Sequence, residues 1–259
     1  MHRLVVLLLA ILPLVAAAQR AEYRIDEDLL NPYDHEMTVA LRMHINGFSG
    51  GIENNWIRGP KRTVVLQTDF FYHRDFRQKR IDGIGSNTFL GSRYFYGMQN
   101  RFFSLNVGAG VRRVIAEKED HKGVRLSMTY SGGLSLGFLK PYALDLYPAL
   151  ADDPTTPDYF REPEPETYSE STADRFLDQR FIAGSSGIGS GWSGLAVVPG
   201  AHGRFAFNFD WSGNEEMIIM LETGVQVQAY YRKLDVMLNE TNRPLVFSLY
   251  LAVIMGKRW

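Results

Sequence analysis

The sequence predicts an all-β fold, an eight-stranded antiparallel transmembrane β-barrel, with ten strands as the alternative. Three observations lead to this prediction. Several long segments alternate strictly between apolar and polar residues, and their polar residues are mostly small. After the first 18 residues, no apolar run is long enough for a membrane-crossing helix, which needs about 18 residues or more. A closed barrel is the β arrangement that leaves no strand edge unpaired in hydrocarbon.

The clearest alternation is VRLSMTYSGGLSLGF, Val124 to Phe138, where every second residue is apolar or Gly. The residues between are mainly Ser, Thr and Gly. Strands of soluble proteins usually have about 5–6 residues, whereas a tilted strand needs about 9–11 to cross a bilayer. A soluble sandwich would also carry an outer face rich in Lys, Glu and Thr. The pattern therefore favours a narrow polar lumen and a lipid-facing apolar band.

The same reasoning places all eight strands. They are expected at residues 36–48, 62–73, 88–97, 101–116, 122–140, 199–211, 217–231 and 245–258. An even number puts both chain ends in the periplasm, which makes Ser212–Glu216 a periplasmic turn and residues 148–198 a long extracellular loop. Residues 74–87 are long for a periplasmic turn, and Tyr142–Tyr147 could continue a strand or begin another, which keeps ten strands open.

The first 18 residues predict a secretory signal peptide. A short basic start precedes an apolar run, Leu4 to Val15, and Ala16–Ala18 then supply a small-residue cleavage site. A retained amphipathic anchor is the alternative. The mature chain would begin at Gln19, with residues 19–35 as a periplasmic arm and residues 36–259 as the barrel. We therefore expect an integral protein of the outer membrane.

The end of the chain carries a second targeting feature. The last expected strand ends in an aromatic residue and resembles the signal read by the barrel-assembly machinery. Its apolar positions are Phe247, Leu249, Leu251, Val253, Met255 and Trp259. Lys257 and Arg258 would lie at the level of the lipid headgroups.

Composition limits the other partners and the cofactors. The formal net charge is -1, which argues against nucleic-acid binding as the main role. Cys is absent, so disulfides and metal sites built on thiolates are excluded. The expected partners are outer-membrane lipid and lipopolysaccharide, the assembly machinery during insertion, and an outer-membrane protein. No cofactor is expected.

Several charged residues fall on the polar faces of the expected strands. This lumen polar cluster contains Arg42, His44, Asp69, Arg112, Arg125, His202, Arg204 and Glu222. With Ser104, Ser127 or Ser131, a Ser–His–carboxylate set is conceivable, because such triads are defined by geometry. A paired polar interior is the favoured interpretation, since unpaired buried charges are costly. No catalytic residue is assigned.

The most unusual composition lies in the expected extracellular loop, from Asp152 to Asp174, which is rich in acids and Pro. One hypothesis is a surface cation site. Its candidate ligands are Asp152, Asp153, Asp158, Glu162, Glu164 and Glu166. A basic partner protein is a second hypothesis, and a solvated loop without a ligand is the favoured one. The segment Ala173–Gly184 is expected to form a short helix that folds over or into the barrel mouth or docks a partner. GSGWSG, Gly189–Gly194, fits a nucleotide-binding template but lacks a βαβ context, so it is interpreted as a loop.

A family resemblance supports the barrel. The stretches Tyr96–Pro141 and His44–Trp56, the Pro199–Gly200 pair before a Phe-rich strand, and the closing GKRW resemble outer-membrane barrel proteins of Bacteroidota-type bacteria. The resemblance implies an outer-membrane location and a single barrel domain, and it supplies no catalytic residues.

These observations favour a non-enzymatic role. We expect a structural or partner-binding outer-membrane protein, which includes an accessory subunit of an outer-membrane assembly. The alternatives are a narrow pore or small-ligand carrier, and a lipid-modifying or proteolytic barrel enzyme. An eight-stranded barrel has room inside for little more than its own side chains.

Overall fold

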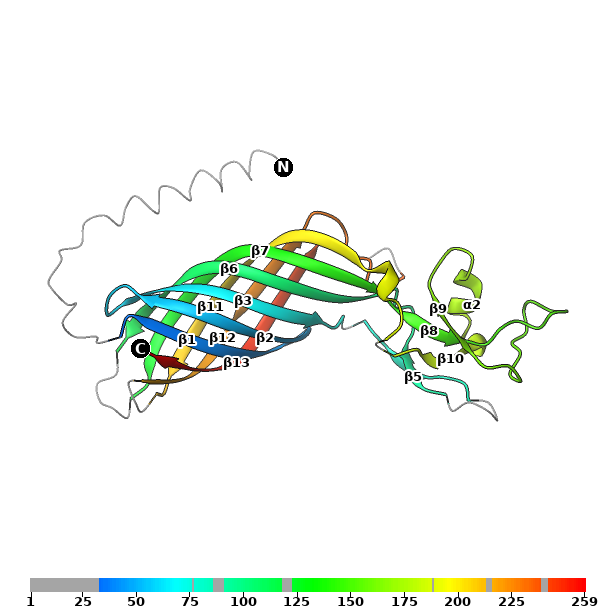
Figure 1. Cartoon of the computed structure of the whole chain (residues 1–259), viewed down its shortest axis with the longest axis horizontal. Helices are drawn as coiled ribbons and strands as arrows, with labels where there is room; N and C mark the ends of the chain where they lie inside the picture. The colour runs from blue at the N-terminus through cyan, green and yellow to red at the C-terminus, as the bar shows by residue number, and fades with distance from the viewer. Residues whose placement is uncertain are drawn as a thin grey trace. The chain divides into compact units, whose positions relative to one another are not determined.

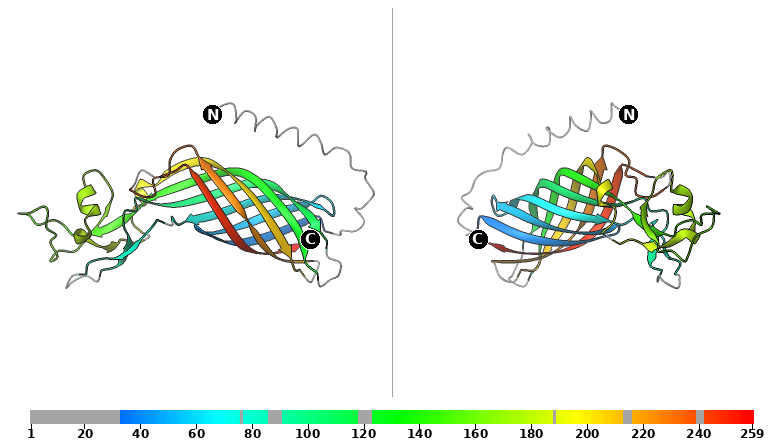
Figure 2. Two further views of the ribbon diagram at one scale, coloured as in Figure 1. Left: turned by 180° about the vertical axis from the view of Figure 1, so that it is seen from behind. Right: turned by 45° about the vertical axis from the view of Figure 1, so that its right-hand side comes forward.

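The computed structural model describes residues 33–75, 77–85, 91–117, 123–187, 189–212, 216–238 and 242–259. The expected signal peptide and nearly all of the expected arm lie outside these residues. The described chain forms a closed, eight-stranded antiparallel barrel (Figure 1). Its strands are β1 (His35–His44), β2 (Gly47–Ile57), β3 (Arg62–His73), β6 (Asn100–Ala116), β7 (Arg125–Pro141), β11 (Ala196–Asp210), β12 (Met217–Tyr230) and β13 (Leu245–Arg258). Each strand pairs with its neighbours in the chain order of the barrel, and β1 closes the ring against β13 (Figure 2).

The two ends of the barrel differ in their connections. We call the end where β1 begins and β13 finishes the terminal end, and the opposite end the loop end. The connections at the terminal end are short, and Ser212–Glu216, the expected periplasmic turn, is one of them. Residues 74–99, 142–195 and 231–244 connect strands at the loop end. Residues 74–87 therefore belong to a loop-end connection, which removes the difficulty of their length.

The number of strands was predicted correctly, but one predicted strand was wrong. In the described part of this range, residues 91–97, the only strand is β5 (Arg93–Phe95), which pairs outside the barrel with β4 (Arg80–Asp82). Its Tyr94 is buried in a core beyond the barrel, so lipid-facing alternation cannot apply there. The missing barrel strand is β2, which follows β1 through a two-residue turn. Tyr142–Tyr147 contributes β8 (Ala143–Leu146) to a separate sheet, so the described barrel has eight strands and not ten.

The barrel strands alternate in burial as their sequences alternate in polarity. Along β1 every second residue is buried, while the apolar residues between, such as Leu41 and Met43, are 68% and 76% exposed. Trp56 and Trp259 flank His35 at the terminal end, with His35 stacked on Trp259 at 6.3 Å between ring centroids. An apolar belt with aromatic residues at its edge is the outer surface that a lipid-facing barrel needs.

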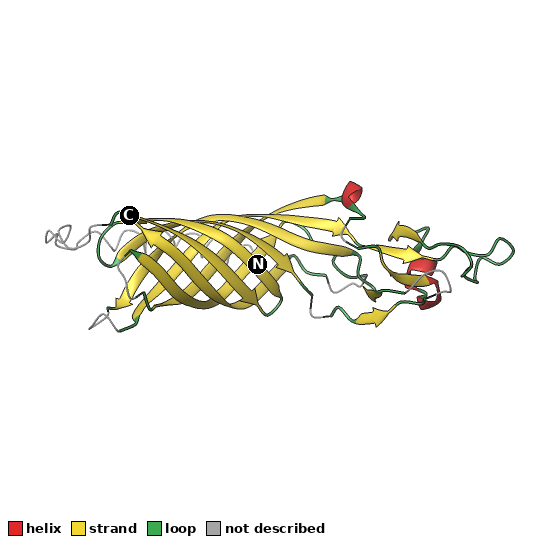
Figure 3. Cartoon of the chain, turned by 60° about the horizontal axis from the view of Figure 1, so that its bottom comes forward, coloured by secondary structure: helices red, strands yellow, loops and turns green. Residues whose placement is uncertain are grey.

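Three connections extend beyond the barrel strands at the loop end, and we call this region the cap: the described parts of residues 74–99, 142–195 and 231–244. Short strands and helices lie beyond the barrel in Figure 3. The cap contains β4, β5 and β8, together with β9 (Glu164–Thr167), α2 (Ala173–Leu177) and β10 (Ile182–Ser185). β8 is the middle strand of a three-stranded sheet with β9 and β10. None of the helices in the described residues is long and apolar enough to cross a membrane.

The cap has an apolar core that continues into the barrel mouth. Leu144, Phe176 and Ile182 of the cap belong to the same buried cluster as Phe102 and Tyr230 of the barrel. Backbone hydrogen bonds join the loops, for example from Leu238 N to Gly97 O at 2.8 Å. The expected helix over Ala173–Gly184 is shorter than predicted: α2 is followed by a 3₁₀ turn (Gln179–Phe181) and then by β10. The cap therefore projects beyond the loop end and is joined to the barrel mouth by this apolar core (Figure 1).

Candidate functional site

Seven of the eight predicted lumen residues lie buried inside the barrel. These are Arg42, His44, Asp69, Arg112, His202, Arg204 and Glu222. The eighth, Arg125, lies at the terminal-end start of β7 with its side chain 35% exposed, where it forms an ion pair with Glu117 at 3.0 Å. The structure therefore brings together all but one of these charges.

Glu53 of β2 is the centre of the lumen ion pairs. Its Oε1 accepts hydrogen bonds from the Nη2 atoms of Arg42 at 2.5 Å and Arg204 at 2.9 Å, and its Oε2 accepts one from Arg112 Nη2 at 3.2 Å. All four side chains are nearly inaccessible to solvent. A carboxylate that holds three buried guanidiniums stabilises the interior chiefly by preventing unpaired buried charge.

The network extends from Glu53 in two directions. Towards the terminal end, Glu36 binds both Arg112 and Arg258, the latter at 3.2 Å, and Arg258 also contacts Asp210 at 3.3 Å. Across the lumen, Glu222 Oε1 accepts a hydrogen bond from Arg42 Nε at 3.3 Å. Acidic and basic side chains thus alternate through the lumen, and their charges compensate one another.

Aromatic rings fill the lumen from its middle towards the loop end. They form a column in which successive ring centroids are 5.1, 4.0, 3.7, 4.5 and 5.3 Å apart. In order, the rings belong to Tyr250, His44, Phe71, His73, Phe102 and Tyr230. Together with the ion pairs, this column occupies the interior with side chains.

Three lumen histidines contact serine hydroxyls. His44 contacts Ser248 and Ser49, each at 2.9 Å, while His202 contacts Ser135 at 3.2 Å. His73 contacts Ser104 at 3.1 Å. A hydroxyl beside an imidazole is one part of a nucleophile-and-base arrangement. Among the described residues, however, no carboxylate lies within hydrogen-bond distance of these imidazoles, and the serines are buried. The contacts are typical of polar satisfaction in a packed interior.

The central residue, Glu53, was missed by the sequence reasoning. Gly47, Gly50 and Gly51 interrupt the apolar alternation of β2, so the stretch was not interpreted as a strand. The available signal was Asn46–Gly47, because Asn-Gly between two alternating segments predicts a hairpin, and the structure places the two-residue turn one position earlier, at Ile45 and Asn46. Gly47 has a φ of 141°, and a Cβ there would lie 2.0 Å from Tyr72 O.

The predicted acidic residues of the cap do not converge. Asp153 accepts hydrogen bonds from Thr155 and Thr156, and Glu166 pairs with Arg175 at 3.0 Å. In the described part of the chain, no group of three His, Cys, Asp or Glu side chains is placed to hold a metal ion. The acidic segment instead presents Phe160, which is 92% exposed.

The residues of the expected assembly signal share one face. Phe247, Leu249, Leu251, Val253 and Met255 all lie on the outer side of β13, each 44–57% exposed, and Trp259 is 56% exposed at the terminal end. They form part of the outer apolar belt.

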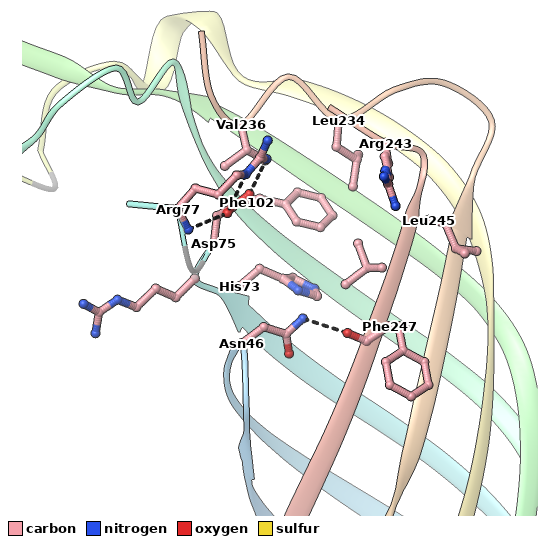
Figure 4. Close-up of a pocket in the computed structure, with 12 residues that line it drawn as sticks. Asn46, His73, Asp75, Arg77, Phe102, Leu234, Val236, Arg243, Leu245 and Phe247 are labelled. Atoms are coloured by element: carbon pink, nitrogen blue, oxygen red, sulfur yellow. Dashed lines mark hydrogen bonds and ion pairs between the residues drawn. The ribbon is translucent and has the colours of Figure 1, made fainter. Parts of the chain in front are cut away.

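A pocket of about 390 Å³ lies at the loop-end rim, where the barrel meets the cap (Figure 4). Its apolar walls come from β6, β13 and residues 231–244 of the cap, and include Phe102, Leu234, Val236, Leu245 and Phe247. Its polar groups are Asn46, His73, Arg74, Asp75, Arg77 and Arg243. The size is in the range of small-molecule sites.

Asp75 and Arg77 form an ion pair in this pocket, with Arg77 Nη2 donating to Asp75 Oδ2 at 2.5 Å. Burial by itself raises the pKa of Asp75, but hydrogen bonds from the side chain and backbone of Arg77 outweigh burial and hold the pKa below its usual value. The carboxylate is therefore ionised and compensated at neutral pH.

No family model matches the chain, and no curated protein matches it. Among solved structures, it is similar to Neisserial surface protein A, with 9% identity and a TM-score of 0.41 over 87% of this chain and 94% of that one. It is also similar to the N-terminal β-barrel domain of Pseudomonas aeruginosa OprF, with 8% identity and a TM-score of 0.37 over 87% and 96%. Ail of Yersinia pestis gives 7% identity and a TM-score of 0.36 over 87% and 95%. At these values the barrel assignment rests on the strand pairing of this chain itself.

Proposed function

We propose that this chain is an integral outer-membrane barrel whose cap binds a protein partner at the cell surface, as a structural protein or an accessory subunit of an outer-membrane assembly. In this proposal the loop end is extracellular and the terminal end is periplasmic. The last strand carries the signal that the barrel-assembly machinery recognises. Membership of the Bacteroidota-type family suggested by the sequence motifs belongs to the same proposal.

The outer surface of the barrel supports the membrane location. The apolar side chains of β1 and β13 point outward, and on this face of β13 the first charged residue is Lys257 at the terminal end. β1 and β2 have 10 and 11 residues, which matches the length that a tilted strand needs to cross a bilayer, about 9–11 residues.

The filled lumen favours partner binding over transport. The Glu53 ion pairs and the aromatic column occupy the interior between the terminal end and the cap. A solute could pass only if several buried ion pairs were broken, and each leaves a costly unpaired charge. The loop end also carries an apolar core that joins the cap to the barrel mouth, which neither a pore nor lipid insertion requires.

The observation that carries the proposal is an exposed aromatic residue on an ordered, acidic turn. Phe160 is 92% exposed, and its backbone N donates to Asp158 Oδ1 at 3.0 Å. The adjacent Tyr159 holds the turn by packing on Tyr147 and donating to Arg180 O at 3.0 Å. A pre-positioned aromatic side chain is a typical anchor for a partner pocket. The surrounding acids favour a partner pocket with a basic rim.

The test is purification of the intact protein from outer membranes in mild detergent, with the mass of the particle measured by native mass spectrometry. We expect one stoichiometric partner on the wild-type protein and its loss from Phe160→Ser. Tyr231→Ser is the matched control, because Tyr231 is 72% exposed but lies on another part of the cap. A wild-type protein that is recovered alone, or a partner that Phe160→Ser retains, would contradict the proposal.

A further inference from the structure

The floor of the rim pocket holds a buried imidazole with one unpartnered nitrogen. His73 ends β3, is 7% exposed, and stacks on the rings of Phe71 and Phe102, with 3.7 and 4.5 Å between centroids. Its Nε2 contacts Ser104 Oγ at 3.1 Å, but its Nδ1 has no hydrogen-bond partner among the described residues. Figure 4 shows the His73 ring extending into the pocket below Phe102. Because an unpartnered buried nitrogen is costly, this floor favours a ligand that supplies the missing hydrogen bond.

The apolar walls of the pocket are continuous with the outer belt. Leu245 and Phe247 line the pocket and are 56% and 53% exposed on the same face of β13 as Leu249. Leu234 and Val236 of the cap supply a second apolar wall, and both are buried. A hydrocarbon chain that lies along the belt therefore has an apolar path into the pocket.

The barrel wall is also incomplete at this place. The last pair between β1 and β13 is His44 with Tyr250. β13 continues beyond this level, where residues 245–247 pair with β12 but not with β1. A side-chain hydrogen bond from Asn46 Nδ2 to Phe247 O at 3.3 Å crosses the step between the two strands. The pocket therefore lies beside a gap in the strand pairing of the wall.

The chemistry of the floor selects a hydroxyl group. Ser104 Oγ can donate to His73 Nε2 or accept from it, so Nδ1 is a donor in one tautomer and an acceptor in the other. A hydroxyl both donates and accepts, and it therefore satisfies either tautomer. A charged group would have to leave water for a floor stacked with phenyl rings, which is costly. The charges of Asp75 and Arg77 already compensate each other in the same pocket.

We propose that this pocket binds a single-chain hydrocarbon with a hydroxyl group, a long-chain alcohol, which enters from the surrounding leaflet. The hydroxyl contacts His73 Nδ1, and the chain lies against Leu234, Val236 and Phe247. No anionic group takes part, so no arginine of the rim is assigned to the ligand. The inference rests on the proposed membrane location and is independent of the partner proposed for Phe160.

The test uses the intact protein in phosphatidylcholine nanodiscs and a photoreactive dodecanol that carries a diazirine on its chain. We expect saturable labelling within residues 231–247, mapped by mass spectrometry of the peptides. Unlabelled dodecanol should compete about three- to tenfold better than dodecane at equal amounts per lipid, because only the alcohol forms the hydrogen bond. Equal competition by the two compounds would leave Nδ1 to an ordered water and overturn the proposal. Labelling that does not saturate would overturn it as well.

The variant His73→Phe keeps a ring in the aromatic column but removes both nitrogens. Competition by dodecanol should then fall to the level of dodecane, while dodecane competes as in the wild type. The matched control is His44→Phe, because His44 belongs to the same column but does not line the pocket. His44→Phe should keep the preference for the alcohol, and so should Arg243→Gln.

Two outcomes with the variants would contradict the proposal. Loss of the preference in His44→Phe as well as in His73→Phe would assign the effect to packing of the column. A His73→Phe protein that keeps the preference would show that the hydroxyl is not bound at this ring. Heat-dependent mobility on gels reports barrel folding separately, and either outcome leaves the Phe160 partner untouched.

Discussion

The lumen and the cap are both buried interiors, but they are built from opposite chemistry. The lumen is packed with Glu, Arg, Asn, Gln and Ser side chains, and its centre is a carboxylate between three guanidiniums. The cap is packed with Leu, Ile, Phe and Tyr. The difference follows from what each region faces on its outside.

The barrel strands place their apolar residues outward, so the inward positions are left to polar groups that must satisfy one another. The cap lies beyond the outer apolar belt, so its apolar residues turn inward as in a water-soluble domain. Within a few residues of the rim, the buried interior of the chain therefore changes from polar to apolar. Tyr230 marks the change, since it ends the aromatic column and also belongs to the apolar cluster of the cap.

The largest expected effect comes from removing the centre of the lumen. Glu53→Gln leaves three buried guanidiniums without their common carboxylate, and we expect a loss of about 3–5 kcal/mol in the free energy of unfolding. Denaturant titration of the protein in lipid vesicles, followed by Trp fluorescence, measures it.

The control is Glu216→Gln, because Glu216 is half exposed and pairs with Lys257 at 3.7 Å. It should change stability by less than about 0.5 kcal/mol. If Glu53→Gln costs no more than this control, the lumen is not held by its ion pairs, and the contrast with the cap fails.

The second prediction addresses the cap core. Ile182 is fully buried there, and Ile182→Ala should cost the cap about 2–5 kcal/mol through the cavity it leaves. We expect faster proteolysis between residues 142 and 195, with heat-dependent gel mobility of the barrel unchanged. Leu177→Ala, at a position 39% exposed on α2, is the control and should leave the cap protease-resistant. Loss of the barrel in Ile182→Ala would show that the two interiors unfold as one.

The third prediction compares two exposed leucines. Leu251 is 51% exposed on β13 and Leu150 is 40% exposed in the cap. If the belt faces lipid, Leu251→Arg should lose about 2–4 kcal/mol of stability in vesicles. Leu150→Arg should change little, because water surrounds the cap. Equal tolerance of Arg at both positions, measured by the same denaturant titration, would argue against a lipid-facing belt.

The sequence predicts the barrel better than the cap, and the reason is physical. A lipid-facing strand must alternate along its whole length, so β6, β11, β12 and β13 lie within a few residues of their predicted bounds. β2 has Gly at three positions, of which Gly47 and Gly51 pack closely against β3, and its alternation is obscured. The local alternation of apolar and polar residues therefore identifies a strand only where contact with lipid requires that alternation.

The cap depends on contacts between residues far apart in the chain. Met98 bridges to Met237, and Ser92 N donates to Ala183 O at 3.0 Å. No local periodicity encodes such contacts, so β5 was assigned to the barrel. The lumen is intermediate: inward polar residues can be identified from alternation, but the pairing of Arg42 with Glu222, 180 positions away, depends on how the barrel closes.

The smallest predicted effect lies at the rim between the two regions. Asp75→Asn removes the carboxylate that holds the Arg77 side chain and accepts from Arg77 N at 2.9 Å. Because the folded pKa of Asp75 is lowered, its ion pair adds stability above the unfolded pKa and loses it as the pH falls through the folded pKa. We expect a local cost of about 0.5–1 kcal/mol at neutral pH, seen as faster amide exchange at Arg77. The difference between wild type and variant should begin to shrink below about pH 4, near the unfolded pKa, and should vanish only at a pH below the lowered folded pKa. If the difference persists at that pH, the prediction is wrong. The packing of the cap would then order the rim, and the Asp75–Arg77 pair would be a consequence of that packing.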